Sequence, residues 1–218
     1  MLVILLGAPG VGKGTQAELL AKDYNLVTLS TGEILRNAVR RKAKLGIQVR
    51  EVMSSGGLVS DDMVCPLVKN ELKQKTNHNG YILDGFPRTI YQAHILDDIV
   101  ITSYFEKSYI VSLSLEEEEI VKRLSARIFC KNCNQGYNSI TKKSKTKGKC
   151  DVCGHVYFYT RKDDKKSTIK VRLSAYIAQT SLLIEYYKAY ENYIDIDASQ
   201  DIEKIHKEIV SFIEKHKT

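Results

Sequence analysis

The sequence predicts an α/β protein with a five-stranded, parallel, doubly wound sheet, and three observations support this. Short apolar runs alternate with helical patterns along the chain, which is the order of a parallel sheet covered by helices. The first apolar run ends in a glycine-rich turn that leads directly into a helical pattern. Two cysteine pairs later interrupt the alternation, so we also expect one small insertion in the second half of the chain.

The expected elements follow from apolar spacing. Strands are expected at five apolar runs, which are 1–6, 26–29, 81–84, 109–113 and 193–197. Helices are expected where apolar residues recur every three or four positions, at 13–24, 116–126, 167–190 and from 202 to 212. Two more helices are expected to begin near Ser30 and near Asp61. The first of these has a capping-box pattern, because Glu33 follows Ser30 by three positions.

Composition sets the class of protein. The chain has 218 residues, 43% of them hydrophobic, which suffices for one folded core and argues against a disordered chain. No apolar run approaches the roughly 20 residues that span a bilayer. The apolar start of the chain lacks a basic region and meets the glycine-rich turn too early for a signal peptide. We therefore expect a cytoplasmic protein with no membrane partner.

The net charge of +7 is concentrated in one segment. Residues 128–166 contain ten basic and three acidic side chains, and the rest of the chain is neutral. Such a segment either binds polyanions or is a solvated face.

Four of the five cysteines lie in this basic segment. Cys130 and Cys133 form one pair, and Cys150 and Cys153 form the other. In a chain without a secretory signal, this spacing predicts a tetrahedral, structural Zn²⁺ site before it predicts disulfides. His155 is a competing ligand, but four cysteines already complete the site. Cys65 stands alone and is expected to pack in a helix.

Residues 7–13 fit the phosphate-loop pattern GxxxxGK between a strand and a helix. Glycines let backbone amides surround an anion, the helix N-terminus adds partial positive charge, and Lys13 reaches the β- and γ-phosphates. The residue after the lysine is Gly14 rather than the usual Ser or Thr, and the hydroxyl comes at Thr15. We therefore expect Mg²⁺ to be held mainly by nucleotide phosphates and water, with Asp84 acting through water.

Four segments together resemble adenylate kinases: GAPGVGKGTQ at 7–16, STGEILR at 30–36, LDGFPRT at 83–89 and TRKDD at 160–164. The resemblance implies a P-loop kinase that converts ATP and AMP into two ADP. It also implies a division of the chain into a core, a helical AMP-binding insertion and a small zinc-ribbon lid of the kind found in many bacterial members. The core would comprise 1–29, 60–126 and 165–218, the insertion 30–59 and the lid 127–164. A monomer is expected.

The resemblance also implies a role for each matching residue. Phosphoryl transfer needs the two nucleotides to be aligned and their phosphate charge to be neutralised. The planar guanidinium group of arginine is better suited to this than the ammonium group of lysine. The catalytic set would be Lys13, Arg88, Arg123, Arg127, Arg161 and Arg172. ATP would be bound by Gly10, Val11, Gly12, Lys13, Gly14, Thr15, Arg123, Arg127, Gly136, Tyr137 and Gln200. AMP would be bound by Thr31, Arg36, Gly57, Leu58, Val59, Gly85, Phe86, Pro87, Arg88, Gln92, Arg161 and Arg172.

Three other functions stay open at this point. A kinase for UMP, CMP or another nucleotide is disfavoured by Thr31 and Gln92, the second of which suits the adenine edge. A zinc-ribbon protein that binds nucleic acid is suggested by the basic segment, but no row of exposed aromatics accompanies the lysines. A P-loop ATPase switch is disfavoured by the missing hydroxyl directly after Lys13.

In the sequence, Asp197-Ala198 stands where the family usually has Asp-Gly, which puts the turn near Gln200 in doubt.

Overall fold

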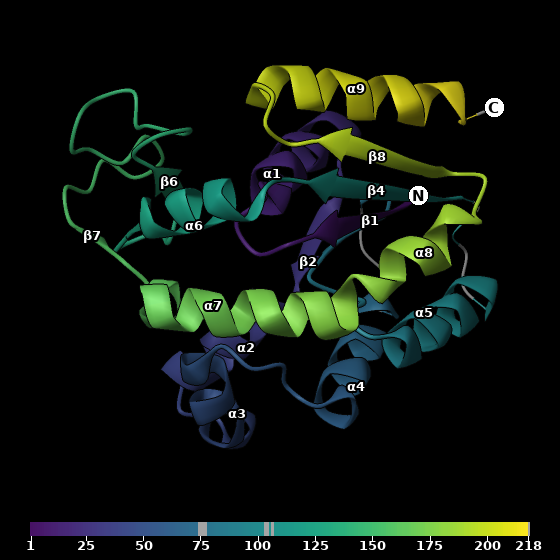
Figure 1. Ribbon diagram of the computed structural model, residues 1–218, viewed down its shortest axis with the longest axis horizontal. Helices are drawn as coiled ribbons and strands as arrows, with labels where there is room; N and C mark the ends of the chain where they lie inside the picture. Colours follow the sequence, from purple (N-terminus) through teal and green to yellow (C-terminus); the bar gives the residue numbers. More distant parts are fainter. Residues whose placement is uncertain (74–77, 103–104, 106, 218) are drawn as a thin grey trace.

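The computed structural model describes residues 1–73, 78–102, 105 and 107–217. Its centre is a parallel sheet with the strand order β2-β3-β1-β4-β8 (Figure 1). The strands are β1 (Leu2–Gly7), β2 (Val27–Ser30), β3 (Tyr81–Asp84), β4 (Ser108–Ser114) and β8 (Tyr193–Asp197). The predicted five-stranded, doubly wound sheet is confirmed, and each strand lies within one or two residues of its predicted range.

Both faces of the sheet are buried under helices. Successive side chains of a strand point to opposite sides, so each strand contributes to two apolar clusters. Leu2, Ile4 and Leu6 pack in one apolar cluster, whereas Val3 and Leu5 pack in another. The first cluster lies under helices α4 (Asp61–Leu72), α5 (Ile90–Thr102) and α8 (Leu182–Lys188). The second lies under α1 (Lys13–Tyr24) and α9 (Ile202–Lys215), which Figure 1 shows on the opposite face. Cys65 is buried in α4, as expected.

The phosphate loop leaves the carboxyl end of β1, the edge at which open α/β sheets bind ligands. Gly7 has φ 131°, and a Cβ there would stand 2.4 Å from the carbonyl oxygen of Leu113 on β4. Only glycine therefore lets the chain turn this close to the neighbouring strand.

The predicted insertion at 30–59 contains α2 (Thr31–Arg40) and α3 (Lys44–Ser55). The expected capping box is wrong, because no side-chain hydrogen bond from Ser30 caps α2. The Glu33 carboxylate pairs instead with Arg36, Arg40 and Arg161, so three guanidinium groups compete with the backbone for it.

The cysteine-bearing segment forms a separate three-stranded antiparallel sheet at one end of the molecule (Figure 1). Its strands are β5 (Arg127–Cys130), β6 (Gly136–Asn138) and β7 (Phe158–Tyr159), in the order β6-β5-β7. Helix α6 (Glu117–Ser125) leads into this small sheet, and α7 (Lys166–Ala175) leads out of it. We call the segment 127–164 the lid.

The helix expected over 167–190 is not continuous. A π-helical turn, Tyr176–Thr180, separates α7 from α8, and the helical path changes direction there (Figure 1). Such turns often occur at functional sites. Here the turn brings the Thr180 hydroxyl to 3.0 Å from the Arg88 carbonyl oxygen, to which it donates a hydrogen bond. Across the described residues, no helix combines the length and the apolar character that crossing a membrane requires.

Candidate active site

A cleft of about 1370 Å³ lies between the phosphate loop, the insertion at 30–59 and the lid. This volume exceeds the roughly 300–1,000 Å³ typical of a site for one small ligand. The cleft is lined at one end by the loop 7–15, at the other by α2 and 56–59, and along its side by 84–88 and α7. The arrangement therefore offers room for two ligands end to end.

Lys13 lines the cleft at the start of α1. Its Nζ donates hydrogen bonds to the carbonyl oxygens of Gly7 (2.7 Å) and Ala8 (2.9 Å). Burial lowers the pKa of Lys13 to about 8, with Asp84 opposing the shift and Arg88 among the cations that reinforce it. The ammonium group is thus held in a place where positive charge is unfavourable until an anion arrives.

Three arginines share this environment. Burial, followed by the charge of Arg172, lowers the pKa of Arg88 to about 10. The Arg88 Nε donates to the carbonyl oxygen of Gly85 at 2.9 Å. Asp164, which is almost fully buried, holds Arg127 and Arg172 together, with its oxygens 2.9 Å from Arg127 Nε and 2.9 Å from Arg172 Nη1. Contacts within the protein therefore hold these guanidinium groups in place.

Arg161 enters the cleft from the lid. Its guanidinium lies 3.6 Å above the Phe129 ring, a cation–π contact that holds it flat. Burial and the nearby charge of Arg36 lower the pKa of Arg161 to about 10. Glu33 contacts both cations, at 3.2 Å from Arg36 Nε and 3.4 Å from Arg161 Nη2. Burial disfavours the Glu33 carboxylate, but Arg40, Arg36 and Arg161 outweigh burial and lower its pKa.

The pocket at the far end of the cleft is built around Gly85. The Thr31 hydroxyl donates to the Gly85 carbonyl oxygen at 2.7 Å. Gly85 has φ +81°, and a Cβ there would stand 2.8 Å from the Arg88 guanidinium. Gln92 is buried, accepting from the Arg88 backbone N–H (2.8 Å) and donating to Asp61 (2.7 Å). One amide hydrogen and one oxygen lone pair of Gln92 are left for a ligand.

At the opposite end, Arg123 joins the phosphate loop to the turn that follows β8. It donates to the carbonyl oxygens of Val11 (3.3 Å) and Ala198 (2.9 Å). The turn itself is closed by Asp197, whose carboxylate accepts from the Ser199 N–H and hydroxyl at 2.8 and 2.7 Å. Ala198 stands where the resemblance would place a glycine, and it is fully buried.

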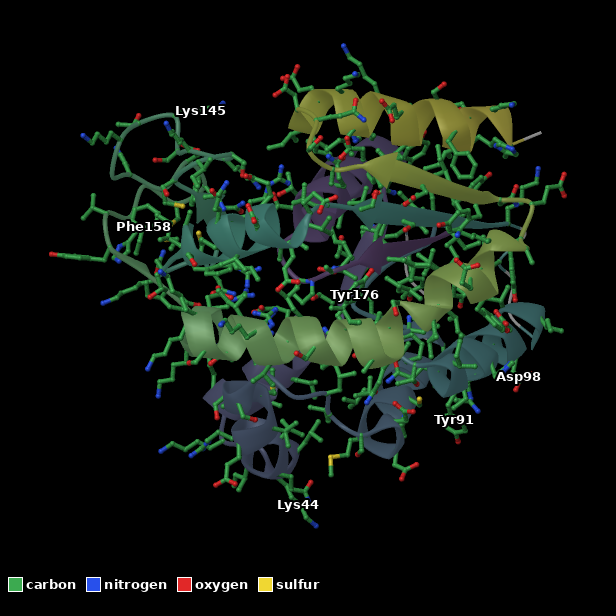
Figure 2. The ribbon with its side chains drawn as sticks, in the orientation of Figure 1. Lys44, Tyr91, Asp98, Lys145, Phe158 and Tyr176 are labelled. Atoms are coloured by element: carbon green, nitrogen blue, oxygen red, sulfur yellow. The ribbon has the colours of Figure 1, made fainter. Side chains whose placement is uncertain are left out.

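The four lid cysteines form one cluster, with their sulfur atoms all within 4.8 Å of one another. The yellow sulfur atoms are visible in the lid near Phe158 (Figure 2). Two of the Sγ–Sγ separations are 3.5 Å. Four thiolates about 2.3 Å from a tetrahedral metal would stand about 3.8 Å apart. The sulfur cage therefore fits a metal of this kind.

The backbone around the cysteines also fits a metal site. Each pair sits in a tight turn that ends on a residue with positive φ, Asn134 at 64° and Gly154 at 72°. The backbone N–H groups of these two residues donate to the carbonyls of Cys130 and Cys150. The His155 ring packs against Tyr157 at 5.4 Å, outside the cysteine cluster.

The cleft collects nearly all the residues that the sequence assigned to nucleotide binding and catalysis. Those lining it are Gly10, Val11, Gly12, Lys13, Gly14, Thr15, Thr31, Arg36, Gly57, Leu58, Val59, Asp84, Gly85, Pro87, Arg88, Gln92, Arg123, Arg127, Gly136, Tyr137, Arg161, Arg172 and Gln200. Phe86 is the exception, because it is fully buried in the core behind the cleft. Tyr137 lines the cleft but is nearly buried, and its hydroxyl faces Cys150 and accepts from the Asp151 N–H.

Sequence reasoning missed four residues that hold the others in place: Glu33, Asp164, Thr180 and Arg40. Arg40 lines the cleft and donates a hydrogen bond to Glu33 at 2.7 Å. The spacing of Glu33 three residues before Arg36, on one helical face, was the available signal for the first of these contacts. The contacts of Asp164 and Thr180 join distant parts of the chain, and no local pattern indicates them.

Comparison with known proteins gives the family. A family model described as adenylate kinase matches residues 5–192. The adenylate kinase of Caldicellulosiruptor bescii is 42% identical over 210 residues, covering 96% of this chain and 97% of the relative. The adenylate kinase of Thermosipho africanus is 40% identical over 99% of this chain and 100% of the relative. That of Archaeoglobus fulgidus is 40% identical over the full length of both. Together with the phosphate loop and the arginine-lined cleft, these matches show that the chain belongs to the adenylate kinase family.

Proposed function

We propose that this protein transfers the terminal phosphoryl group of MgATP to AMP and so forms two ADP. One observation carries the proposal. Lys13, Arg88, Arg127 and Arg172 converge in a cleft that has room for two nucleotides, and at Lys13, Arg88 and Arg172 burial lowers the pKa of the cation. Phosphate groups that meet end to end would supply the negative charge that these groups lack.

The donor nucleotide is assigned to the end formed by the phosphate loop. The backbone of 10–15 and the Lys13 ammonium surround its phosphates at the start of α1. Arg123 and the turn containing Gln200 flank the position of its base, and Gly136 and Tyr137 approach from the lid. AMP is assigned to the other end, where Arg36 and Arg88 hold its phosphate and Thr31, 57–59, Gly85, Pro87 and Gln92 surround the nucleoside. On this account, Phe86 supports the pocket from behind.

The reaction then needs no covalent intermediate. An oxygen of the AMP phosphate attacks the γ-phosphorus, and the bond from that phosphorus to the β–γ bridging oxygen breaks. Lys13, Arg127, Arg161 and Arg172 neutralise the charge that develops on the transferred group and on the departing ADP. Closure of the lid and of the insertion 30–59 over the cleft excludes water, which would otherwise compete with AMP as acceptor.

Two metal ions belong to this proposal. Mg²⁺ would be held mostly by phosphate oxygens and water, because few hard oxygen ligands, chiefly Thr15 and Asp84, line the cleft near the phosphate loop. It would shield phosphate charge. Zn²⁺ would be held by Cys130, Cys133, Cys150 and Cys153 and has a structural role, since four thiolates leave no position for a reacting ligand. The protein is further proposed to act as a cytoplasmic monomer without a nucleic-acid partner.

The choice of acceptor tests the proposed function. ADP formation from MgATP should be measured with AMP, CMP, UMP and GMP in turn. Efficient formation with AMP alone is the expected result, because Thr31 and the free half of the Gln92 amide face an adenine base. Preferred use of UMP or CMP would instead make the protein another nucleoside monophosphate kinase.

Binding of nucleotide should be accompanied by proton uptake at about pH 8.5. Since the pKa of Lys13 is about 8, most of the lysine is neutral at that pH. Nearby phosphates favour the ammonium form and raise this pKa, so the lysine takes up a proton on binding. Calorimetric titration with ATP in two buffers of different ionisation enthalpy measures the uptake. A Lys13→Met variant should take up less, and equal uptake by both proteins would contradict the assignment.

Removal of the lid metal should destabilise the protein more than it impairs chemistry. The lid has few buried apolar side chains, chiefly Phe129 and Tyr137, so cross-linking by Zn²⁺ would supply much of its order. Elemental analysis should find one zinc per chain. Chelation or Cys150→Ser should lower the melting temperature by roughly 4–8 °C for each 2 kcal/mol lost. Activity at low temperature should largely survive. Unchanged melting of a zinc-free preparation would contradict a structural site.

A further inference from the structure

Glu18 lies on the second turn of α1, and 52% of its side chain is exposed. Among the described residues, the hydrogen bonds and the ion pair of its carboxylate all come from the lid. The Nζ of Lys142 lies 2.5 Å from one carboxylate oxygen, and the Nε2 of Gln135 donates to both oxygens, at 3.2 and 3.3 Å. These partners are 124 and 117 residues away in sequence, so the contact requires the lid to lie against α1.

The two lid residues flank the strand β6 (Gly136–Asn138). Gln135 comes directly before the strand. Lys142 lies opposite its last residue, because the Asn138 N–H donates to the Lys142 carbonyl oxygen (2.8 Å) and the Lys142 N–H donates to the Asn138 carbonyl oxygen (3.1 Å). The Asn138 side chain closes the turn between them by accepting from two N–H groups within it. The carboxylate of Glu18 thus holds β6 at both ends.

This contact lies at the donor end of the cleft. Glu18, Gln135 and Lys142 all line the cleft, and β6 carries Gly136 and Tyr137, which the proposed function assigns to ATP. A separate hydrogen bond, from Asn134 to Glu33 at 2.8 Å, joins the lid to the insertion 30–59. The contact with α1 therefore bears on the donor nucleotide, whereas the contact with Glu33 bears on the insertion.

Resting on the proposed function, we propose that Glu18 is a positioning residue of the donor site, which holds β6 of the lid over the phosphoryl donor. It acts on the nucleotide through Gln135 and Lys142. A contact that is present only when the lid is closed raises the closed fraction, and the apparent affinity for ATP rises with that fraction. Because the carboxylate is half exposed, the contact depends on the sign of the charges rather than on packing.

A purely structural role for Glu18 predicts something different. If the residue only stabilised the fold, its replacement would lower the melting temperature and weaken the use of ATP and AMP alike. If it holds the lid over the donor, reversal of its charge raises the KM for ATP and spares the KM for AMP, since most residues assigned to AMP lie outside the lid. Restoring the pair with the charges exchanged then restores the KM for ATP.

The test is an exchange of charge between Glu18 and Lys142. Glu18→Lys sets two ammonium groups against each other, and Lys142→Glu sets two carboxylates against each other. In each single variant we expect the KM for ATP to rise about fivefold or more, while the KM for AMP stays within about twofold and kcat does not fall. The double variant keeps the total charge and the ion pair, and its KM for ATP should return to within about twofold of the wild-type value.

Glu191→Lys is the matched control, because it makes the same change of charge at an exposed residue outside the cleft. It should behave as wild type. Calorimetric titration with ATP should show the same order of affinities as the KM values. If Glu18→Lys does not fold, Lys142→Glu and the double variant still decide the question.

Two results would overturn the inference. One is a KM for ATP that stays unchanged or rises no more than the KM for AMP in the single variants. The other is a double variant that is no better than the single variants. Failure of the proposed function is a different result, since the wild-type protein would then transfer no phosphate from ATP to AMP.

Discussion

Replacement of Lys13 by methionine should lower kcat by about 100- to 1,000-fold or more, the loss seen when one preorganised charge-stabilising group is removed. Lys13 lines the same cleft as Arg88, Arg127 and Arg172, and on the proposed function it would neutralise the transferred phosphoryl group. The fold should persist, because the backbone of the phosphate loop makes its own turn and Lys13 adds two hydrogen bonds to carbonyls within it. Burial disfavours the Lys13 ammonium, so its removal should not weaken the core.

A coupled assay of ADP formation measures the first effect and thermal melting measures the second. Lys22→Met is the matched control, since Lys22 lies on the same helix but is exposed and outside the cleft. The control should keep full activity. Near wild-type turnover in Lys13→Met would show that Lys13 does not stabilise the transferred phosphoryl group.

Arg88→Lys should also lose at least about nine-tenths of its activity, although the charge is kept. The Arg88 side chain is held by the Gly85 carbonyl and its backbone by Gln92 and Thr180, so its planar fork is fixed at the AMP end. A lysine provides a single point charge and cannot bind a phosphate through two parallel hydrogen bonds. The loss should appear in both kcat and the KM for AMP.

Arg50→Lys provides the control for this substitution, because Arg50 is exposed on α3. It should behave as wild type in the same assay. If Arg88→Lys kept more than about a tenth of the activity, a loss below about 1.4 kcal/mol, Arg88 would not be a bidentate ligand of the AMP phosphate.

The features that could be predicted from the sequence are those set by local pattern. Apolar runs gave the strands of the sheet, because a strand buried on both faces needs apolar side chains on both. The GxxxxGK turn and the two cysteine pairs could be found because their chemistry depends on fixed spacing between a few residues. The three-stranded sheet of the lid was not predicted, since its strands are two to four residues long and one is far from the others in sequence.

The features that could not be predicted depend on competition between distant groups. Glu33 fits a capping box, but the guanidinium of Arg161, from the other side of the cleft, helps to draw it away. The spacing of residues 167–190 suits a continuous helix, yet the π-helical turn places Thr180 against the Arg88 carbonyl. Asp164 sits in a motif that the sequence revealed, but its role as the clamp of Arg127 and Arg172 appears only in three dimensions.

The central claim is that the cleft transfers a phosphoryl group between two nucleotides and excludes water. Incubation with MgATP labelled in the γ-phosphate, together with unlabelled AMP, tests this directly. The account predicts that the label appears in the β-phosphate of newly formed ADP, that little inorganic phosphate is released, and that transfer stops when AMP is omitted. Release of the label as inorganic phosphate, at a rate independent of AMP, would make the protein an ATPase and contradict the account.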